Sequence, residues 1–139
     1  MYYFSKNSEN NLLECHLDLY HLFHRVIKYQ DCFVIIGYRG EQEQDRAFHM
    51  GSSQLKYPQS KHNKKPSLAV DAVPWFKNPP HIRWDDRDKF YYFGGFVLGV
   101  AAEMKINVRW GGDWDQDGEL HDQKFFDLSH FELGGIDGN

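Results

Sequence analysis

The sequence predicts a single α+β domain over residues 1–139, in which helices pack on a small antiparallel sheet. A chain of 139 residues that is 41% hydrophobic is long enough for one compact core and too short for two domains. Apolar residues recur at helical spacing in two segments, and short apolar runs rich in β-branched residues lie between and after them. No internal repeat or low-complexity segment interrupts this mixed pattern.

The first part of the chain predicts two helices and a strand. Ser8 is the expected N-cap of a core-facing helix. Its apolar positions are Leu12, Leu13, Leu17, Tyr20, Phe23, Val26 and Ile27. The apolar run 32–38 predicts a central strand that ends at Gly37, and residues 41–50 predict a short helix. Residues 51–66 are rich in Ser, Lys, Asn and Pro and predict a surface loop, of a length that often carries function.

Asp71 interrupts a strand predicted over residues 68–73, which is otherwise apolar. Side chains alternate between the two faces of a strand, so both faces of this one are expected to be buried except at Asp71. A buried carboxylate is costly unless it is paired, hydrogen-bonded or bound to a metal. The stretch therefore predicts a specific partner for Asp71, and His62, nine positions earlier, is the first candidate.

The second half of the chain predicts one more helix and two strands. The helix extends from residue 85 to about residue 105, with inward positions Phe90, Phe93, Val97, Leu98 and Ala101. Three glycines weaken it by roughly 1 kcal/mol each relative to alanine unless close packing uses them. These are Gly94, Gly95 and Gly99. Residues 106–112 and 128–133 predict strands, and an acidic loop separates them.

Composition excludes several classes of protein. The formal net charge of −4 argues against a nucleic-acid partner, and no stretch approaches the roughly 18 apolar residues of a membrane span. The N-terminus lacks the basic and apolar regions of a signal peptide, so we expect a protein without its own export signal. Cys15 and Cys32 have no metal-binding spacing and are interpreted as reduced structural thiols.

The candidate chemistry gathers around the last predicted strand. If that strand brings His130 to the pocket of His62 and Asp71, the three side chains form a set of two histidines and one carboxylate. Such a set suits zinc with an open fourth position, and it equally suits non-haem iron, so composition alone does not choose the metal. Asp127, three residues before His130, is not needed as a ligand and is placed to take a proton from an attacking water.

Two paired signatures carry a resemblance to a known family: S-K-H at 60–62 with A-V-D at 69–71, and D-L-S-H-F-E at 127–132. They resemble the zinc peptidases of the D-alanyl-D-alanine carboxypeptidase family, and within it the phage endolysins that act as L-alanyl-D-glutamate peptidases. The segment 37–48 is similar to the family's G-x-R segment with a downstream Gln, and 109–115 is similar to its GGDW loop. The resemblance covers most of the chain and implies a hedgehog-like or D,D-peptidase-like fold.

The resemblance also implies roles for single residues. His62, Asp71 and His130 would hold zinc, and Asp127 would be the general base. Arg39 would steady the developing oxyanion or a substrate carboxylate, although the residues alone also allow a salt-bridged arginine at a strand end.

Three further features have two interpretations or depart from the family. Glu132 alternates with His130 along the strand and either orients that histidine or pairs with a Lys or Arg. The family often has a glycine where this chain has Ser67. It also has a tighter His-to-Asp spacing, so we interpret residues 63–66 as a loop elongation that leaves the ligands intact.

The acidic loop resembles half of a calcium site. Asp113, Asp115 and Asp117, followed by Gly118, reproduce the first half of a calcium loop. The twelfth position is Lys124 and not Glu, which excludes a full EF-hand. A looser calcium site and a solvated acidic turn remain as alternatives, and the turn is favoured.

These observations favour a zinc peptidase that hydrolyses peptidoglycan stem peptides, of the L-alanyl-D-glutamate endopeptidase type. The alternatives are a D,D-carboxypeptidase or dipeptidase, and a catalytically silent binding module that keeps zinc. Asp127 and Arg39 favour the enzyme. An iron-dependent oxygenase is a weaker candidate because its first histidine and acid usually lie two residues apart. We expect a monomeric phage endolysin that stays in the host cytoplasm until a separate holin opens the membrane, and then acts on the cell wall.

Overall fold

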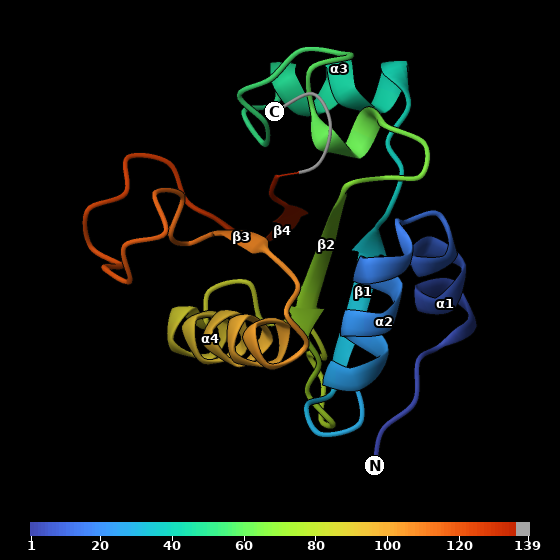
Figure 1. Ribbon diagram of the computed structural model, residues 1–139, viewed down its shortest axis with the longest axis vertical. Helices are drawn as coiled ribbons and strands as arrows, with labels where there is room; N and C mark the ends of the chain where they lie inside the picture. Colours follow the sequence, from blue (N-terminus) through green and yellow to red (C-terminus); the bar gives the residue numbers. More distant parts are fainter. Residues whose placement is uncertain (136–139) are drawn as a thin grey trace.

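The computed structural model describes residues 1–135, which form an α+β domain of the predicted class (Figure 1). The helices among these residues are α1 (Lys6–Leu13), α2 (Leu17–Val26), α3 (Glu41–His49), the 3-10 helix η1 (Lys61–Asn63) and α4 (Arg87–Glu103). The strands are β1 (Cys32–Ile36), β2 (Ala69–Pro74), β3 (Val108–Gly111) and β4 (Asp127–Leu133). None of the helices in this part of the chain has both the length and the apolar character to span a membrane.

The four strands form one antiparallel sheet in the order β1-β2-β4-β3. Helices α2 and α4 pack against each other, and α4 also contacts β2, β3 and β4. Helix α3 and η1 lie beyond the end of the sheet at which β2 begins (Figure 1). In the pairing of β2 with β4, Asp71 is directly opposite His130. The register of the sheet therefore brings two of the predicted site residues together.

Aromatic side chains fill the core between the sheet and the helices. Phe131 of β4 packs its ring against Phe23 of α2, Phe93 of α4 and Trp110 of β3, at centroid distances of 5.5, 5.9 and 6.5 Å. All four side chains are buried. Strand β2 is buried on both faces, as its apolar pattern predicted.

The prediction of one continuous helix from residue 8 to residue 27 is wrong. The chain forms α1 and α2, because the backbone between them pairs with residue 67. The N–H of His16 donates to the carbonyl of Ser67, and the N–H of Ser67 donates to the carbonyl of Glu14, both at 2.9 Å. His16 then caps α2, since its Nδ1 accepts the N–H of Asp18 at 3.0 Å.

The expected N-cap is also wrong by three residues. Ser5 caps α1, whereas Ser8 lies within the helix and is buried. The Ser8 hydroxyl accepts the N–H of Val34 at 3.0 Å, which ties α1 to β1. The break after α1 leaves Leu13 and Leu17, two of the predicted core positions, exposed to solvent.

The segment predicted as a surface loop over residues 51–66 contains η1. Ser60 caps η1 in a capping box with Asn63: the Ser60 hydroxyl accepts backbone N–H groups of the turn, and the Asn63 side chain accepts the N–H of Ser60 at 3.0 Å. Both residues are buried, so residues 60–63 form a packed turn within this segment, whereas residues 64–66 are exposed as predicted.

The two cysteines are free and buried. Burial raises the pKa of the Cys15 thiol to about 12, and it also raises the pKa of Cys32. Thiolate is therefore scarce at neutral pH, in agreement with a structural role.

Gly94 is the glycine of α4 that close packing uses. A Cβ added there would lie 2.3 Å from the Trp110 indole, whereas a Cβ at Gly95 would meet no atom within 4 Å. We expect Gly94→Ala to lower the free energy of unfolding by about 1–3 kcal/mol through overpacking. The matched Gly95→Ala is expected to raise it by about 0.5–1 kcal/mol, because alanine is the better helix former. Urea unfolding of both variants measures the difference, and effects of the same sign would contradict this packing.

Candidate metal centre

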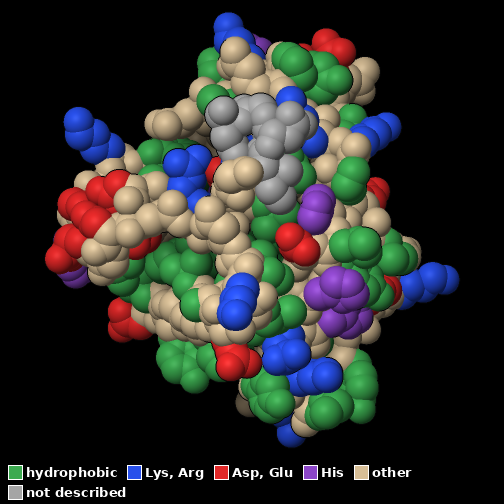
Figure 2. Space-filling view, in the orientation of Figure 1, with side chains coloured by type: hydrophobic (Ala, Val, Ile, Leu, Met, Phe, Trp, Pro, Cys, Tyr) green, Lys and Arg blue, Asp and Glu red, His purple; other side chains and the backbone are tan. Residues whose placement is uncertain are grey.

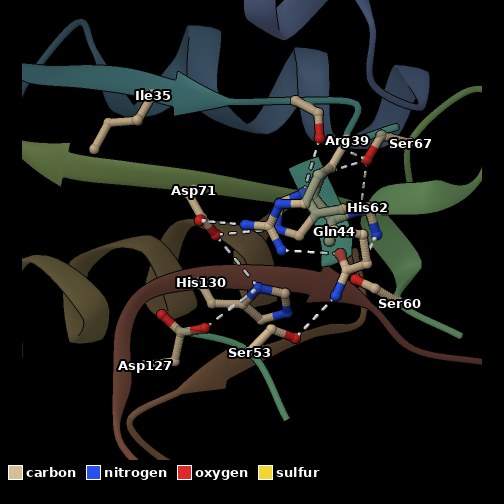
Figure 3. A network of polar contacts seen from close by, with 12 residues as sticks. Ile35, Arg39, Gln44, Ser53, Ser60, His62, Ser67, Asp71, Asp127 and His130 are labelled. Atoms are coloured by element: carbon tan, nitrogen blue, oxygen red, sulfur yellow. Dashed lines mark hydrogen bonds and ion pairs between the residues drawn. The ribbon is translucent and has the colours of Figure 1, made fainter. Parts of the chain in front are cut away.

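Three buried side chains converge at the end of the sheet near η1 (Figure 3). Asp71 extends from β2, His130 from β4 and His62 from η1. The Asp71 Oδ1 atom lies 3.1 Å from His62 Nε2 and 3.3 Å from His130 Nδ1. The relative exposures of His62, Asp71 and His130 are 1%, 8% and 7%. The structure thus brings together the two histidines and the carboxylate that the sequence pattern singled out.

A backbone carbonyl orients His62. Its Nδ1 donates to the carbonyl of Gly37 at 2.8 Å, and the Ser67 hydroxyl donates to the same carbonyl at 3.0 Å. Ser67, which replaces the glycine often found in the resembling family, is therefore hydrogen-bonded beside the site. None of residues 63–66, which the sequence analysis interpreted as a loop elongation, lines the adjoining cavity.

A buried carboxylate orients His130. Its Nε2 donates to Glu132 Oε1 at 2.8 Å, and Glu132 Oε2 lies 2.8 Å from Arg109 Nη2 and 3.5 Å from Lys61 Nζ. The sequence allowed two interpretations of Glu132, and both contacts are present: it accepts from His130, and it pairs with Arg109 and Lys61. Burial opposes the ionisation of Glu132, but His130 and Arg109 outweigh it and lower its pKa to about 2.

The hydrogen bonds of the two imidazoles decide which nitrogens face Asp71. A carbonyl or carboxylate can only accept, so His62 carries its proton on Nδ1 and His130 carries its proton on Nε2. In the neutral rings, the lone pairs of His62 Nε2 and His130 Nδ1 then face the Asp71 oxygen. A cation between them, either a proton on an imidazole or a metal ion, stabilises three acceptors that converge at this spacing. The donor set fits a metal ion that prefers imidazole nitrogen with one carboxylate.

The surrounding charges also stabilise a cation. Burial disfavours the charged imidazole of His130, yet Asp71, Glu132 and Asp127 raise its pKa to about 10. Burial likewise opposes ionisation of Asp71, but His62 and His130 outweigh it and lower the Asp71 pKa. The site therefore stabilises positive charge at the position where the three acceptors meet.

Asp127 lies at the edge of this set and not within it. Its Oδ2 is 3.9 Å from His130 Nδ1, and its side chain is more exposed than those of the three converging residues. Burial and the negative charge of Asp71 raise the pKa of Asp127 to about 6, against the opposing effect of His130 and Arg39. A carboxylate with a pKa near neutrality is suited to accept and return a proton.

Arg39 reaches the site from the opposite side. Its Nη2 lies 3.6 Å from Asp71 Oδ2, and its Nη1 donates to Gln44 Oε1 at 3.1 Å (Figure 3). Gln44 is fully buried and also donates to the Ser53 hydroxyl at 3.1 Å and to the Leu55 carbonyl at 2.7 Å. Gln44 thus holds Arg39 in place and joins α3 to the loop after it. The sequence analysis noted a glutamine downstream of Arg39 but assigned it no role.

A cavity of about 310 Å³ opens beside the three converging residues. It is lined by residues between positions 53 and 61 and, from β3, β4 and the segment between them, by Arg109, Trp114, Phe125 and Glu132. The indole of Trp114 is tilted against the His130 ring at a centroid distance of 5.4 Å. Asp127 and Arg39 also line this cavity, so the acidic and basic candidates face the same space.

The acidic loop forms a separate cluster. Negative side chains gather on the lobe between β3 and β4, at the left of the molecule in Figure 2. Carboxylate oxygens of Asp113, Asp115 and Asp117 lie within 4.8 Å of one another. Asp113 accepts the N–H groups of Asp117 and Gly118, at 3.3 and 2.8 Å, as in a self-contained acidic turn. The solvated acidic turn, favoured over a looser calcium site, stays a prediction.

Comparisons with known proteins identify the family of this chain. Residues 1–134 match the family model described as phage L-alanyl-D-glutamate peptidase. The L-alanyl-D-glutamate peptidase of Escherichia phage T5 is 28% identical over 135 residues, which cover 94% of this chain and 96% of the phage protein. The crystal structure of the Serratia marcescens L-Ala D-Glu endopeptidase ChiX is similar, with a TM-score of 0.70 and 28% identity over 94% of this chain and 88% of that chain. The family match spans nearly the whole sequence, and the chain therefore belongs to the phage L-alanyl-D-glutamate peptidase family.

Proposed function

We propose that the chain is a zinc-dependent endopeptidase that hydrolyses the bond between L-alanine and D-glutamate in peptidoglycan stem peptides. The observation that carries this proposal is the convergence of three acceptor atoms, from His62, Asp71 and His130, beside an open cavity. The family match supplies the substrate class. A zinc ion held by these residues would supply a Lewis acid that polarises the scissile carbonyl and lowers the pKa of water.

The other residues of the site transfer the proton, stabilise the oxyanion and orient His130. Asp127 accepts a proton from the attacking water and returns it to the leaving amine, a role supported by its position at the cavity and its raised pKa. Arg39, held by Gln44, stabilises the oxyanion that develops on the scissile carbonyl. Glu132 keeps the His130 lone pair aimed at Asp71 by accepting the proton on the other nitrogen.

The same observations favour this proposal over a silent zinc-binding module and over a D,D-carboxypeptidase or dipeptidase. A silent zinc-binding module needs neither an acid nor an arginine at the cavity, yet Asp127 and Arg39 both line it. A D,D-carboxypeptidase or dipeptidase shares the proposed zinc chemistry but not the description of the matching family. Incubation of the purified protein with defined muropeptides, followed by mass spectrometry of the new termini, identifies the bond that is cut.

The family further supports a role in host lysis. The matching family and the T5 relative are phage proteins. We infer that the enzyme accumulates in the host cytoplasm and reaches the wall after a separate holin opens the inner membrane.

The first prediction of the proposed function concerns metal content. Purified protein is expected to hold about one zinc per chain, and His62→Ala and His130→Ala are expected to lose it because each removes one of the three converging acceptors. His81→Ala is the matched control, since His81 stacks on Trp75 at a centroid distance of 4.6 Å and lies outside the set. Metal analysis after dialysis measures the content. Full zinc occupancy in the two site variants would remove these residues from the proposed ligand set.

The second prediction concerns Asp127. Asp127→Asn keeps the size of the side chain but not its basicity, so we expect zinc to be retained and turnover to fall by at least about a hundredfold, within the usual 10²- to 10⁴-fold effect of a general base. Asp45→Asn, on the exposed surface of α3, is the control. Turnover of a muropeptide and zinc content are measured on the same samples. Zinc loss would make Asp127 a ligand, and near-normal turnover would reassign the proton transfer to another group.

The third prediction concerns access to the wall. Expression in the cytoplasm of cells with an intact inner membrane is expected to leave the culture turbid, and permeabilisation of that membrane is expected to cause rapid lysis. Cells that express Asp127→Asn should remain turbid in both conditions. Lysis of unpermeabilised cells by the active protein would contradict the need for a separate holin.

A further inference from the structure

Arg109 lines the same cavity as Arg39 and has no assigned role in the proposed chemistry. It belongs to β3 and pairs in register with Glu132 of β4. Its Nη2 donates to Glu132 Oε2 at 2.8 Å, and its guanidinium carbon lies 5.3 Å from the centroid of the Trp114 ring. The guanidinium is therefore held on two sides, by a buried carboxylate and by an aromatic face.

Arg109 is also the cation of this cavity that is most open to a ligand. Three basic side chains line the cavity in the described part of the chain, namely Arg39, Lys61 and Arg109. Arg39 is engaged by Asp71 and Gln44, and its side chain is 11% exposed. Lys61 is engaged by Glu132 and by the carbonyl of Leu133, and its side chain is 17% exposed.

The Arg109 side chain is 41% exposed, whereas Glu132, to which it is anchored, is 8% exposed. A guanidinium carries five N–H donors. Within residues 1–135, the hydrogen bond to Glu132 uses one of them. The remaining donors form a planar fork that suits a carboxylate.

Glu132 holds the Arg109 guanidinium close to the place where the scissile bond would lie. One oxygen of Glu132 accepts from His130 and the other accepts from Arg109. Arg109 is thus separated from a proposed metal ligand by the width of a single carboxylate. An anionic group bound by Arg109 would lie on a substrate atom close to the scissile amide.

The proposed substrate carries such a group. In an L-alanyl-D-glutamate bond the amine of D-glutamate is acylated, so whichever of its two carboxyl groups continues the chain, the other remains. It is an anion unless it is amidated. We propose that Arg109, anchored by Glu132 and Trp114, binds this free carboxylate and makes the enzyme prefer D-glutamate over its amidated form. This inference rests on the proposed function and adds a determinant of specificity to it.

The test uses two acetylated stem tripeptides that differ only in whether this D-glutamate carboxyl is free or amidated. For each enzyme the ratio of kcat/KM for the two peptides is measured, so that losses of folded protein or zinc cancel. We expect the wild-type protein to prefer the free carboxylate by about 10- to 150-fold, the effect of one hydrogen bond to a charged group. In Arg109→Gln the ratio should fall to about one, and in Arg109→Lys it should be intermediate.

Arg25→Gln is the control, because Arg25 is also partly exposed and pairs with a carboxylate, Glu103, outside this cavity. It should keep the wild-type ratio. A wild-type ratio near one, or an Arg109→Gln variant that keeps the preference while losing activity equally on both peptides, would overturn the inference alone. If Arg109→Gln is too poorly folded or too poor in zinc to assay, an unchanged ratio in Arg109→Lys overturns it. Cleavage of neither peptide by the wild-type protein would overturn the proposed function together with the inference.

Discussion

Asp71 places a carboxylate in a strand that is buried on both faces, and the neighbouring segments are arranged around that charge. The pairing of β2 with β4 sets His130 opposite it, η1 adds His62, and the segment after β1 adds Arg39. An isolated charge at this depth would destabilise the fold, since its hydration is lost on burial. Its compensation by the Arg39 guanidinium, and by a cation held between Asp71 and the two imidazoles, links the stability of the sheet end to the chemistry of the cavity.

Further hydrogen bonds orient His62, His130 and Arg39. The carbonyl of Gly37 selects the tautomer of His62, Glu132 selects that of His130, and Gln44 holds Arg39. Each of these partners is itself buried or part of the backbone. Imidazoles held in this way keep their lone pairs directed at one point without help from a ligand, which is a form of preorganisation.

Local sequence patterns predicted the strands and residues of the site, although the local pattern of the first helix was misinterpreted. The strand that carries Asp71 was predicted from an apolar run, and the strand that carries His130 was predicted over residues 128–133. The pattern of acid and histidines named the residues that the fold brings together. Long-range contacts were not predictable in this way. The break between α1 and α2 depends on hydrogen bonds to Ser67, and the position of Arg109 depends on its register with Glu132. Neither pairing changes the spacing of apolar residues in the sequence, from which the elements were predicted.

The strand order has a consequence for the time at which the site forms during synthesis. Strand β4 is the last strand within residues 1–135, yet it lies between β2 and β3 in the sheet. In a nascent chain that extends only as far as β3, the place of β4 between β2 and β3 is empty. Such a chain also lacks His130 and Asp127. Insertion of β4 completes the sheet and delivers both residues in one step. The candidate metal centre is thus complete only when β4 is in the sheet, and under the proposed function a chain that ends before β4 lacks two of the residues that would cut peptides.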